Sequence, residues 1–299
     1  MTDVSAVVAK RNRRTLAQRI ARNWELYLLL LLPTAYIVIF HYGPMYGVQI
    51  AFKEYIVTRG ITGSPWIGFD HFQRFLGHYM FWRIFRNTIV LSLYQLAAGF
   101  PVPIILAVLL NYCPNKRYKK TVQMITYAPH FISVVVMVGI IFQMLGPRYG
   151  LVNSLFRLAG GTTVDFMGRA ELFRHIYVWS GVWQRMGWSS IIYLAALSAI
   201  DPQLHEAAIV DGATKVRRIW HVDLPGILPT IVILLILNVG RLMRVGFEKA
   251  LLMQNPLNIS HSEIIQTYVY KIGIAGSFPQ FSYASAIGLF NAIISFILL

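Results

Sequence analysis

Six apolar runs of membrane-spanning length are the main feature of the hydrophobic pattern. They lie at about 24–42, 87–112, 122–145, 175–198, 228–252 and 281–299. An α-helix needs roughly 20 apolar residues to cross the hydrocarbon core of a bilayer, so each run suits one span, the last being the shortest. The pattern predicts an all-α membrane protein with six transmembrane helices. Residues 1–23 form a separate basic segment before the membrane domain of residues 24–299.

Lysine and arginine are concentrated in every second segment between these runs. Residues 1–25 hold six of them, the link 113–120 holds four and the segment 199–227 holds three. The intervening segments are longer, and 43–86, 146–174 and 253–280 hold five, four and one. Because basic residues accumulate on the cytoplasmic side, we expect both termini and residues 199–227 to be cytoplasmic.

Composition and charge support this class. Hydrophobic residues make up 56% and charged residues 13% of the 299 positions, against roughly 25% charged in a soluble domain. A net charge of +15 would suggest nucleic acid in a soluble protein, but these bases flank apolar runs, so we expect membrane lipid and no nucleic acid as partner. Cys113 is the one cysteine, and the eight histidines show no metal-ligand spacing. No catalytic or metal-binding residue is predicted.

The polar segment between the fourth and fifth runs has the signals of a helical hairpin. Asp201 and Pro202 suit the start of a helix, and Gly212 suits its left-handed end. The first helix would place Leu204, Ala207 and Ala208 on one face. A second apolar stripe and a closing proline follow, at Val216, Ile219, Trp220 and Pro225. Two short helices at a right angle are therefore predicted on the inner membrane surface.

Two interpretations of this hairpin follow from its chemistry. Its alanines would let another backbone approach closely, which indicates a docking element for a cytoplasmic partner. A plain amphipathic connector lying on the bilayer would show the same apolar stripes. The residues by themselves leave both open.

The stretch "EAAIVDGATKVRRIWHVDLP" resembles the coupling-helix motif of ABC importer permeases. Val222 is the one departure, because isoleucine is more usual there. Most of the chain resembles sugar-importer permeases of the maltose-permease type, in particular the polysaccharide branch that includes alginate importers, through "GPMYGVQIAFK" and "NVG…VGFEKALLMQNP". The coupling residues that the resemblance implies are Glu206, Ala207, Ala208, Asp211, Gly212, Val222, Leu224 and Pro225.

The resemblance implies a type I ABC importer permease fold in a bacterial inner membrane. It also implies a second, different permease subunit, a dimer of cytoplasmic ATPase subunits and an extracytoplasmic binding protein seated partly by the outer loop 54–87. The sequence contains no G-x-x-x-x-G-K-[ST] loop, so ATP and Mg²⁺ are expected on the partner ATPase and no cofactor on this chain. The expected role is transport and not catalysis.

Charges inside the fifth run indicate where a substrate would pass. Arg241, Arg244 and Glu248 fall at i, i+3 and i+7, on one face of a continuous helix. Arg241 would lie roughly 18 Å beyond Pro229, near mid-membrane. Charges there are unfavourable by at least a few kcal/mol unless they face water or a partner, so a water-filled path is the first interpretation. A structural ion pair with the partner permease is the alternative.

Two guanidiniums in a sugar path suggest an acidic sugar, because arginine binds a carboxylate through two hydrogen bonds. We therefore expect a uronate-type oligosaccharide such as alginate as substrate. Glu248 could pair with Arg244 or Arg185, and Lys249 could line the path or extend toward the interface. Trp183 could stack on a sugar ring or belong to the interfacial aromatic belt. The predicted path residues are Arg185, Trp183, Arg241, Arg244, Glu248 and Lys249.

Two other classes of protein remain as alternatives. A membrane-embedded glycosyltransferase would need catalytic carboxylates or a metal site near one membrane face, and no such cluster occurs in the sequence. An ion-driven secondary transporter would need carboxylates at mid-membrane, where Glu248 stands alone.

Overall fold

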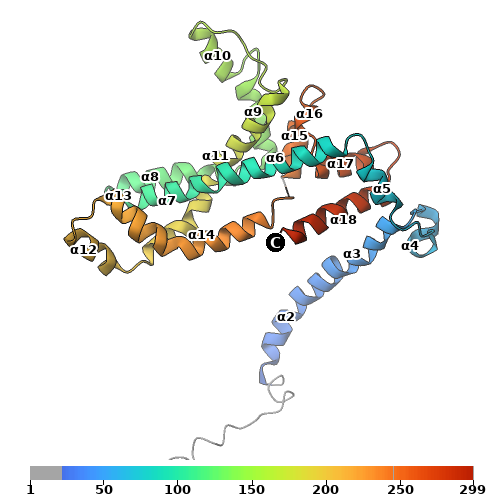
Figure 1. Cartoon of the computed structure of the whole chain (residues 1–299), viewed down its shortest axis with the longest axis horizontal. Coiled ribbons are helices and arrows are strands. Elements are labelled where there is room, and N and C mark those ends of the chain that lie inside the picture. The colour runs from blue at the N-terminus through green and yellow to red at the C-terminus, as the bar shows by residue number, and fades with distance from the viewer. Residues whose placement is uncertain (1–21, 245, 299) are drawn as a thin grey trace, which may run out of the picture.

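The computed structural model describes residues 22–244 and 246–298, and the regular elements in this part of the chain are helical (Figure 1). The extended backbone there forms one isolated antiparallel bridge, between Lys53 and Trp66. The principal helices are α2 (Trp24–Ile37), α3 (Gly43–Met45), α4 (Gly60–Gly63), α5 (Asp70–Leu76), α6 (Phe81–Gly99), α7 (Pro101–Asn111), α8 (Lys116–Tyr127), α9 (Val134–Leu145), α10 (Leu151–Leu158), α11 (Ala170–Ser198), α12 (Pro202–Val210), α13 (Lys215–Arg218), α14 (Leu224–Val239), α15 (Phe247–Met253), α16 (Ile259–Ser262), α17 (Ile265–Tyr270) and α18 (Phe281–Ile297).

Three long helical units run along the long axis of the body (Figure 1). Helices α6 and α7 join at Pro101 into one unit of 31 residues. Helix α11 has 29 residues and packs along α6, α7 and α14. Helix α14 continues α13 through a π-helical turn, so Lys215–Val239 is one unit of 25 residues.

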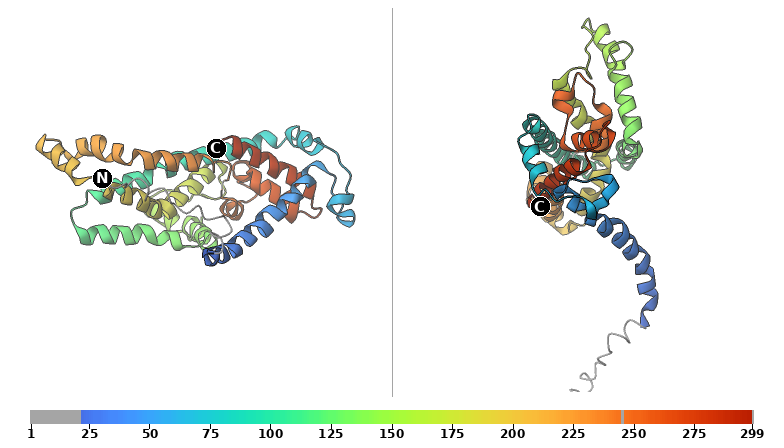
Figure 2. Two further views of the ribbon diagram at one scale, coloured as in Figure 1. Left: turned by 90° about the horizontal axis from the view of Figure 1, so that it is seen from below. Right: turned by 90° about the vertical axis from the view of Figure 1, so that its right-hand side faces the viewer.

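The two basic links expected on one side of the membrane do lie at the same end of the body. The α12–α13 hairpin and the α7–α8 link share this end (Figures 1 and 2). The hydroxyl of Tyr112, directly after α7, donates a hydrogen bond of 2.6 Å to Asp223 at the entrance of α14. At the opposite end the Tyr55 amide donates to the Ser282 hydroxyl of α18, at 2.9 Å. This arrangement agrees with the alternation of segments predicted from the basic residues.

The buried apolar side chains form three clusters along the body. One centres on Tyr177 and Val178 of α11 with α6, α9 and α15. A second joins Phe75 of α5 to α6, α17 and α18. The third joins α7, the end of α11 and Ile227 of α14 beside the hairpin. The helices are therefore held to one another along the whole body and not only at its ends.

Helix α2 extends away from this body (Figure 1). It is apolar around its whole circumference and none of its residues is buried, with Leu32 76% exposed. A helix that is apolar on every side is stable only in lipid or against other apolar helices. Within the described residues, α2 is therefore a membrane helix whose apolar surface is left uncovered.

Two predicted spans depart from continuous helices. In the run 122–145, the helical segments Lys116–Phe131 and Val134–Leu145 meet at an angle of 104°. The fifth run, 228–252, is interrupted after Val239, and helix resumes at Phe247. Gly240 and Gly246 bracket this interruption, and the Met243 carbonyl inside it accepts hydrogen bonds from the side chains of Gln266 and Asn291.

In the part of the chain that the structure describes, three helices are long and apolar enough to cross a membrane by themselves. The bent pair across residues 116–145 gives a fourth candidate, and α18 is a shorter apolar helix. The chain is thus a multi-helix membrane protein, and six spans stay a prediction.

Candidate functional site

The first half of the hairpin is built as its local signals predict. The Asp201 carboxylate caps α12 by accepting a hydrogen bond of 2.9 Å from the Gln203 amide. Gly212 adopts φ +72° after the helix. The amides of Gly212 and Ala213 then donate to the carbonyls of Ile209 and Ala208, at 3.0 and 2.8 Å, which is the bonding of a Schellman motif.

The second half of the hairpin differs from the prediction. Pro225 does not close a separate short helix, because α13 continues through the turn Ile219–Asp223 into α14. Pro225 lies within this continuous unit, two residues after the π-helical turn. The apparent second short helix is therefore a helical extension of the fifth apolar run.

Apolar side chains on the hairpin lack cover from the described part of the chain. Val210 is 86% and Trp220 65% exposed, and no residue of α12 is buried. None of the eight motif residues is buried: Glu206, Ala207, Asp211, Gly212 and Pro225 are exposed, and Ala208, Val222 and Leu224 are half-buried. The surface has the form of a docking element.

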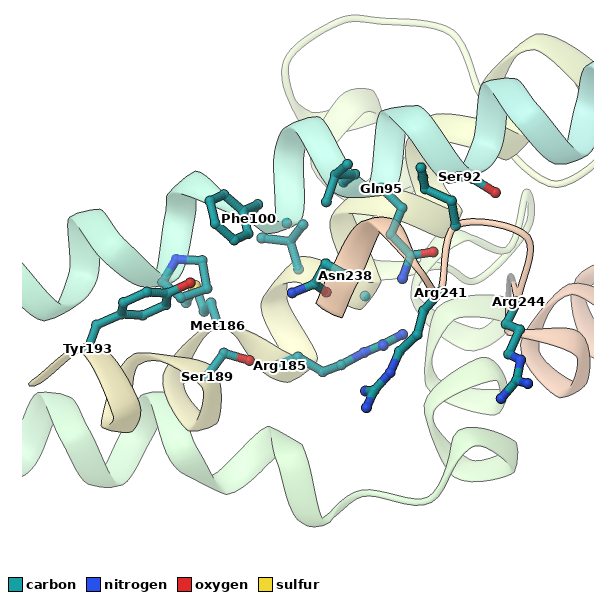
Figure 3. Close-up of a pocket in the computed structure, with 16 residues that line it drawn as sticks. Ser92, Gln95, Phe100, Arg185, Met186, Ser189, Tyr193, Asn238, Arg241 and Arg244 are labelled. Carbon is teal, nitrogen blue, oxygen red and sulfur yellow. The ribbon is translucent and has the colours of Figure 1, made fainter. Parts of the chain in front are cut away.

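A cavity of about 250 Å³ lies between α6, α7, α11 and the end of α14 (Figure 3). Arg185, Arg241 and Arg244 line it, and no aspartate or glutamate is among its described lining residues. The side chains of Arg185 and Arg241 point toward one another in Figure 3, although their charges repel. Three of the predicted path residues thus meet at one cavity, although one comes from α11 and two from the interruption after α14.

The polar groups that accompany these arginines were not predicted. Hydroxyl and amide side chains complete the lining, from Ser92, Gln95, Ser189, Tyr193 and Asn238. None stands out in the sequence, because single polar residues occur within many apolar helices. Their convergence depends on the packing of α6 against α11, which no local pattern specifies.

The shared helix face predicted for Arg241, Arg244 and Glu248 is wrong. Arg241 and Arg244 lie in the non-helical segment after α14, whereas Glu248 is exposed in the first turn of α15. No ion pair joins Glu248 to Arg244 or Arg185 among residues 22–244 and 246–298. The arginines of the cavity therefore have no carboxylate partner in this part of the chain.

Lys249 does not extend toward the membrane surface, as one interpretation expected. It is 4% exposed, and its Nζ donates hydrogen bonds of 2.8 Å to the Tyr177 carbonyl and the Ser180 hydroxyl. A Cβ atom added at Gly181, a lining residue, would come within 3.4 Å of this Nζ. Lys249 thus places an amino group directly behind the cavity wall.

Trp183 lies outside the lining and is 45% exposed. One helical turn earlier, Trp179 donates from Nε1 to the Tyr94 hydroxyl at 2.9 Å.

No group of three His, Cys, Asp or Glu side chains suited to a metal ion occurs in the described residues.

Comparison with known proteins identifies the family of the chain. The family model for the binding-protein-dependent transport system inner membrane component matches residues 74–299. Two relatives come from Bacillus subtilis (strain 168). The polygalacturonan/rhamnogalacturonan transport system permease protein YteP is 43% identical over 99% of this chain and 92% of its own length. Protein LplB is 42% identical over 93% of this chain and 87% of its own length.

Two solved structures share the fold. One is a bacterial ABC transporter involved in the import of the acidic polysaccharide alginate, with a TM-score of 0.88 and 41% identity over 95% of each chain. The other is a bacterial alginate ABC transporter in complex with a periplasmic protein that holds an alginate pentasaccharide. Its TM-score is 0.88, and it is 40% identical over 95% of this chain and 94% of its own length. The chain therefore belongs to the inner membrane components of binding-protein-dependent transport systems, as a permease subunit of an ABC importer and not an enzyme.

Proposed function

We propose that this chain passes an acidic oligo- or polysaccharide of the uronate class across a bacterial inner membrane. One observation carries the proposal: three guanidinium groups share a cavity that has no carboxylate among its described lining residues. A chain of uronates carries a carboxylate on each sugar, so it supplies the charges that the cavity lacks.

The three guanidinium groups lie between helices of the membrane domain. Cations within a membrane domain are strongly unfavourable unless water or an anion faces them. Arginine binds a carboxylate through two parallel hydrogen bonds, which gives orientation as well as attraction. The hydroxyl and amide groups around the arginines can exchange hydrogen bonds with sugar hydroxyls (Figure 3).

The relatives support an acidic substrate. One is named for polygalacturonan and rhamnogalacturonan, and the solved structures concern alginate, described as an acidic polysaccharide. Their similarity extends over nearly the whole of this chain, and therefore over α6, α11 and the interruption that carry the cavity.

The proposed assembly has this chain crossing the membrane six times with both termini in the cytoplasm. A second, different permease subunit completes the translocation path, and a binding protein delivers the saccharide at the outer face. Two ATPase subunits, which hold ATP and Mg²⁺, dock at the hairpins. The exposed apolar side chains of α12 and α13 support the docking, because they would be covered in such a complex.

The test is substrate-stimulated ATPase activity of the reconstituted complex with the double variant Arg241→Ser/Arg244→Ser. Loss of one charge-assisted carboxylate contact corresponds to about 1.5–3 kcal/mol, so we expect the half-stimulating concentration of an oligouronate to rise roughly 10- to 100-fold. A carboxyl-reduced oligosaccharide of equal length should stimulate the ATPase activity of the native and the variant complex equally. Arg117→Ser, on the exposed start of α8, is the matched control for lost positive charge.

Two results would contradict the proposal. In one, acidic and neutral oligosaccharides both stimulate the double variant as they stimulate the native complex. In the other, Arg117→Ser weakens the acidic response as much as the cavity variant does, which would assign the effect to net charge.

A further inference from the structure

Asp223 is a fully buried carboxylate at the base of the hairpin. It is 0% exposed and lies at the end of the π-helical turn between α13 and α14. A buried carboxylate is unfavourable unless hydrogen bonds or a cation compensate. The residue falls between Val222 and Leu224 of the coupling motif, at a position that the motif leaves free, so its burial calls for an explanation of its own.

Two side chains from other elements meet this carboxylate. The Tyr112 hydroxyl, directly after α7, donates to Oδ2 at 2.6 Å. Nε2 of His205, in the middle of α12, lies 3.5 Å from Oδ1. That oxygen is buried and has no hydrogen-bond partner at normal distance. A closer approach of His205 would therefore satisfy an acceptor that is otherwise unpaired.

The three residues link the docking element to both sides of the cavity. His205 belongs to α12, whose outer face is exposed for a partner. Tyr112 ends the unit α6–α7, which lines the cavity from Ser92 to Pro103. Asp223 directly precedes α14, which reaches the cavity at Asn238, roughly 22 Å further along a continuous helix.

We propose that Asp223 is a positioning residue that fixes α12 to the entrance of α14 and the end of α7, so that the three move as one body. Without it, the covalent connection of α12 to α13 is the turn around Gly212. A displacement of α12 by the ATPase would then bend that turn instead of moving α14. With it, the displacement reaches both helices that carry the cavity.

The experiment measures the distance between spin labels on α12 and α14 by double electron–electron resonance. The sample is the full complex in lipid nanodiscs. Labels are attached to Gln203→Cys and Leu228→Cys, both exposed, in a Cys113→Ser background. In the native background we expect one narrow distance distribution, unchanged between the nucleotide-free and the ATP–vanadate states. Asp223→Asn should keep basal ATPase activity within about twofold and broaden or split the distribution when ATP–vanadate is added.

Variants of His205 and Tyr112 distinguish a positioning role of Asp223 from a role in folding. His205→Leu and Tyr112→Phe should broaden the distribution in the ATP–vanadate state, whereas His205→Gln, which keeps a donor, should retain the narrow one. His221→Leu is the matched control, because this exposed histidine bonds only the Arg217 carbonyl, within its own helix. If the complex with Asp223→Asn fails to assemble, His205→Leu and Tyr112→Phe test the positioning role instead, since both keep the Asp223 carboxylate.

The proposal is overturned if the distance distribution stays narrow in both nucleotide states in Asp223→Asn, His205→Leu and Tyr112→Phe. It is also overturned if His221→Leu broadens the distribution as much as His205→Leu. No saccharide enters this experiment, so its result is independent of the substrate class proposed above.

Discussion

The hairpin at residues 201–225 and the cavity around Arg241 are both exceptions to their surroundings, in opposite senses. The hairpin exposes apolar side chains in its polar segment, with Val210 and Trp220 mostly uncovered. The cavity presents Arg185, Arg241 and Arg244 among apolar helices. In the proposed function, an apolar protein surface covers the hairpin and an anion occupies the cavity.

The two regions also differ in how they are built. The hairpin depends on contacts within a few residues, such as the Asp201 cap and the Gly212 turn. The cavity depends on α6, α11 and α14 packing at the right distances. Substitutions should therefore act locally in the first region and through the whole membrane domain in the second.

The largest effect is expected where helix packing leaves no room. A Cβ atom at Gly187 of α11 would lie 2.1 Å from the Thr126 carbonyl oxygen of α8. Gly187→Ala must separate these helices, and overpacking of this kind lowers stability by about 1–3 kcal/mol. We expect a lower melting temperature and little monodisperse protein in detergent. Gly139→Ala, with open space around its Cβ, is the control, and equal behaviour of the two variants would contradict the prediction.

The next effect concerns the hairpin turn. Gly212→Val places a β-branched residue at φ +72°, where left-handed backbone is unfavourable by about 1–2 kcal/mol or more. The population of the docking geometry should fall roughly tenfold, and substrate-stimulated ATPase activity with it. Gly212→Asn should retain most of the activity, because asparagine tolerates this conformation. Equal losses in both variants would show that the turn conformation is not what matters.

A smaller effect is expected from the amino group behind the cavity wall. Lys249→Met removes an amino group that lies behind the lining residue Gly181. The half-stimulating concentration of an oligouronate should rise by less than tenfold, or less than about 1.4 kcal/mol. Lys120→Met, at an exposed position of α8, is the control. A loss larger than that of Arg241→Ser/Arg244→Ser would make Lys249 the principal anion site instead.

The smallest effect is expected at Trp183. This side chain lies outside the cavity lining, so Trp183→Phe should change stimulated ATPase activity by less than about twofold, within the range of ordinary surface substitutions. A large loss, measured beside Arg185→Gln on the same helix, would extend the saccharide path to the outer surface of α11.

Local sequence signals predicted the first half of the hairpin well and the cavity in part. The cap at Asp201 and the turn at Gly212 follow from side-chain and backbone preferences that neighbours scarcely alter. The arginines were identified because charges in an apolar run are conspicuous wherever the helices end. The predicted continuity through 228–252 was wrong, because Gln266 and Asn291 bond the Met243 carbonyl and stabilise an interrupted helix.

The features that sequence did not indicate all depend on distant segments. The burial of Lys249 follows from Tyr177 and Ser180 on α11, and that of Asp223 from Tyr112 after α7. A hydrophobic pattern specifies which face of a helix is apolar, but not which helix covers it. The continuity of Lys215–Val239 was missed because a proline such as Pro225 looks in sequence like a helix end, whereas it lies inside this unit.

Electron cryo-microscopy of the complex, trapped with ATP–vanadate and a defined oligouronate, would show whether the saccharide binds at the arginines. We expect saccharide density in the cavity, with a sugar carboxylate about 2.7–2.9 Å from a guanidinium nitrogen of Arg185, Arg241 or Arg244. Saccharide density elsewhere in the translocation path, with all three arginines free of carboxylate contacts, would contradict it.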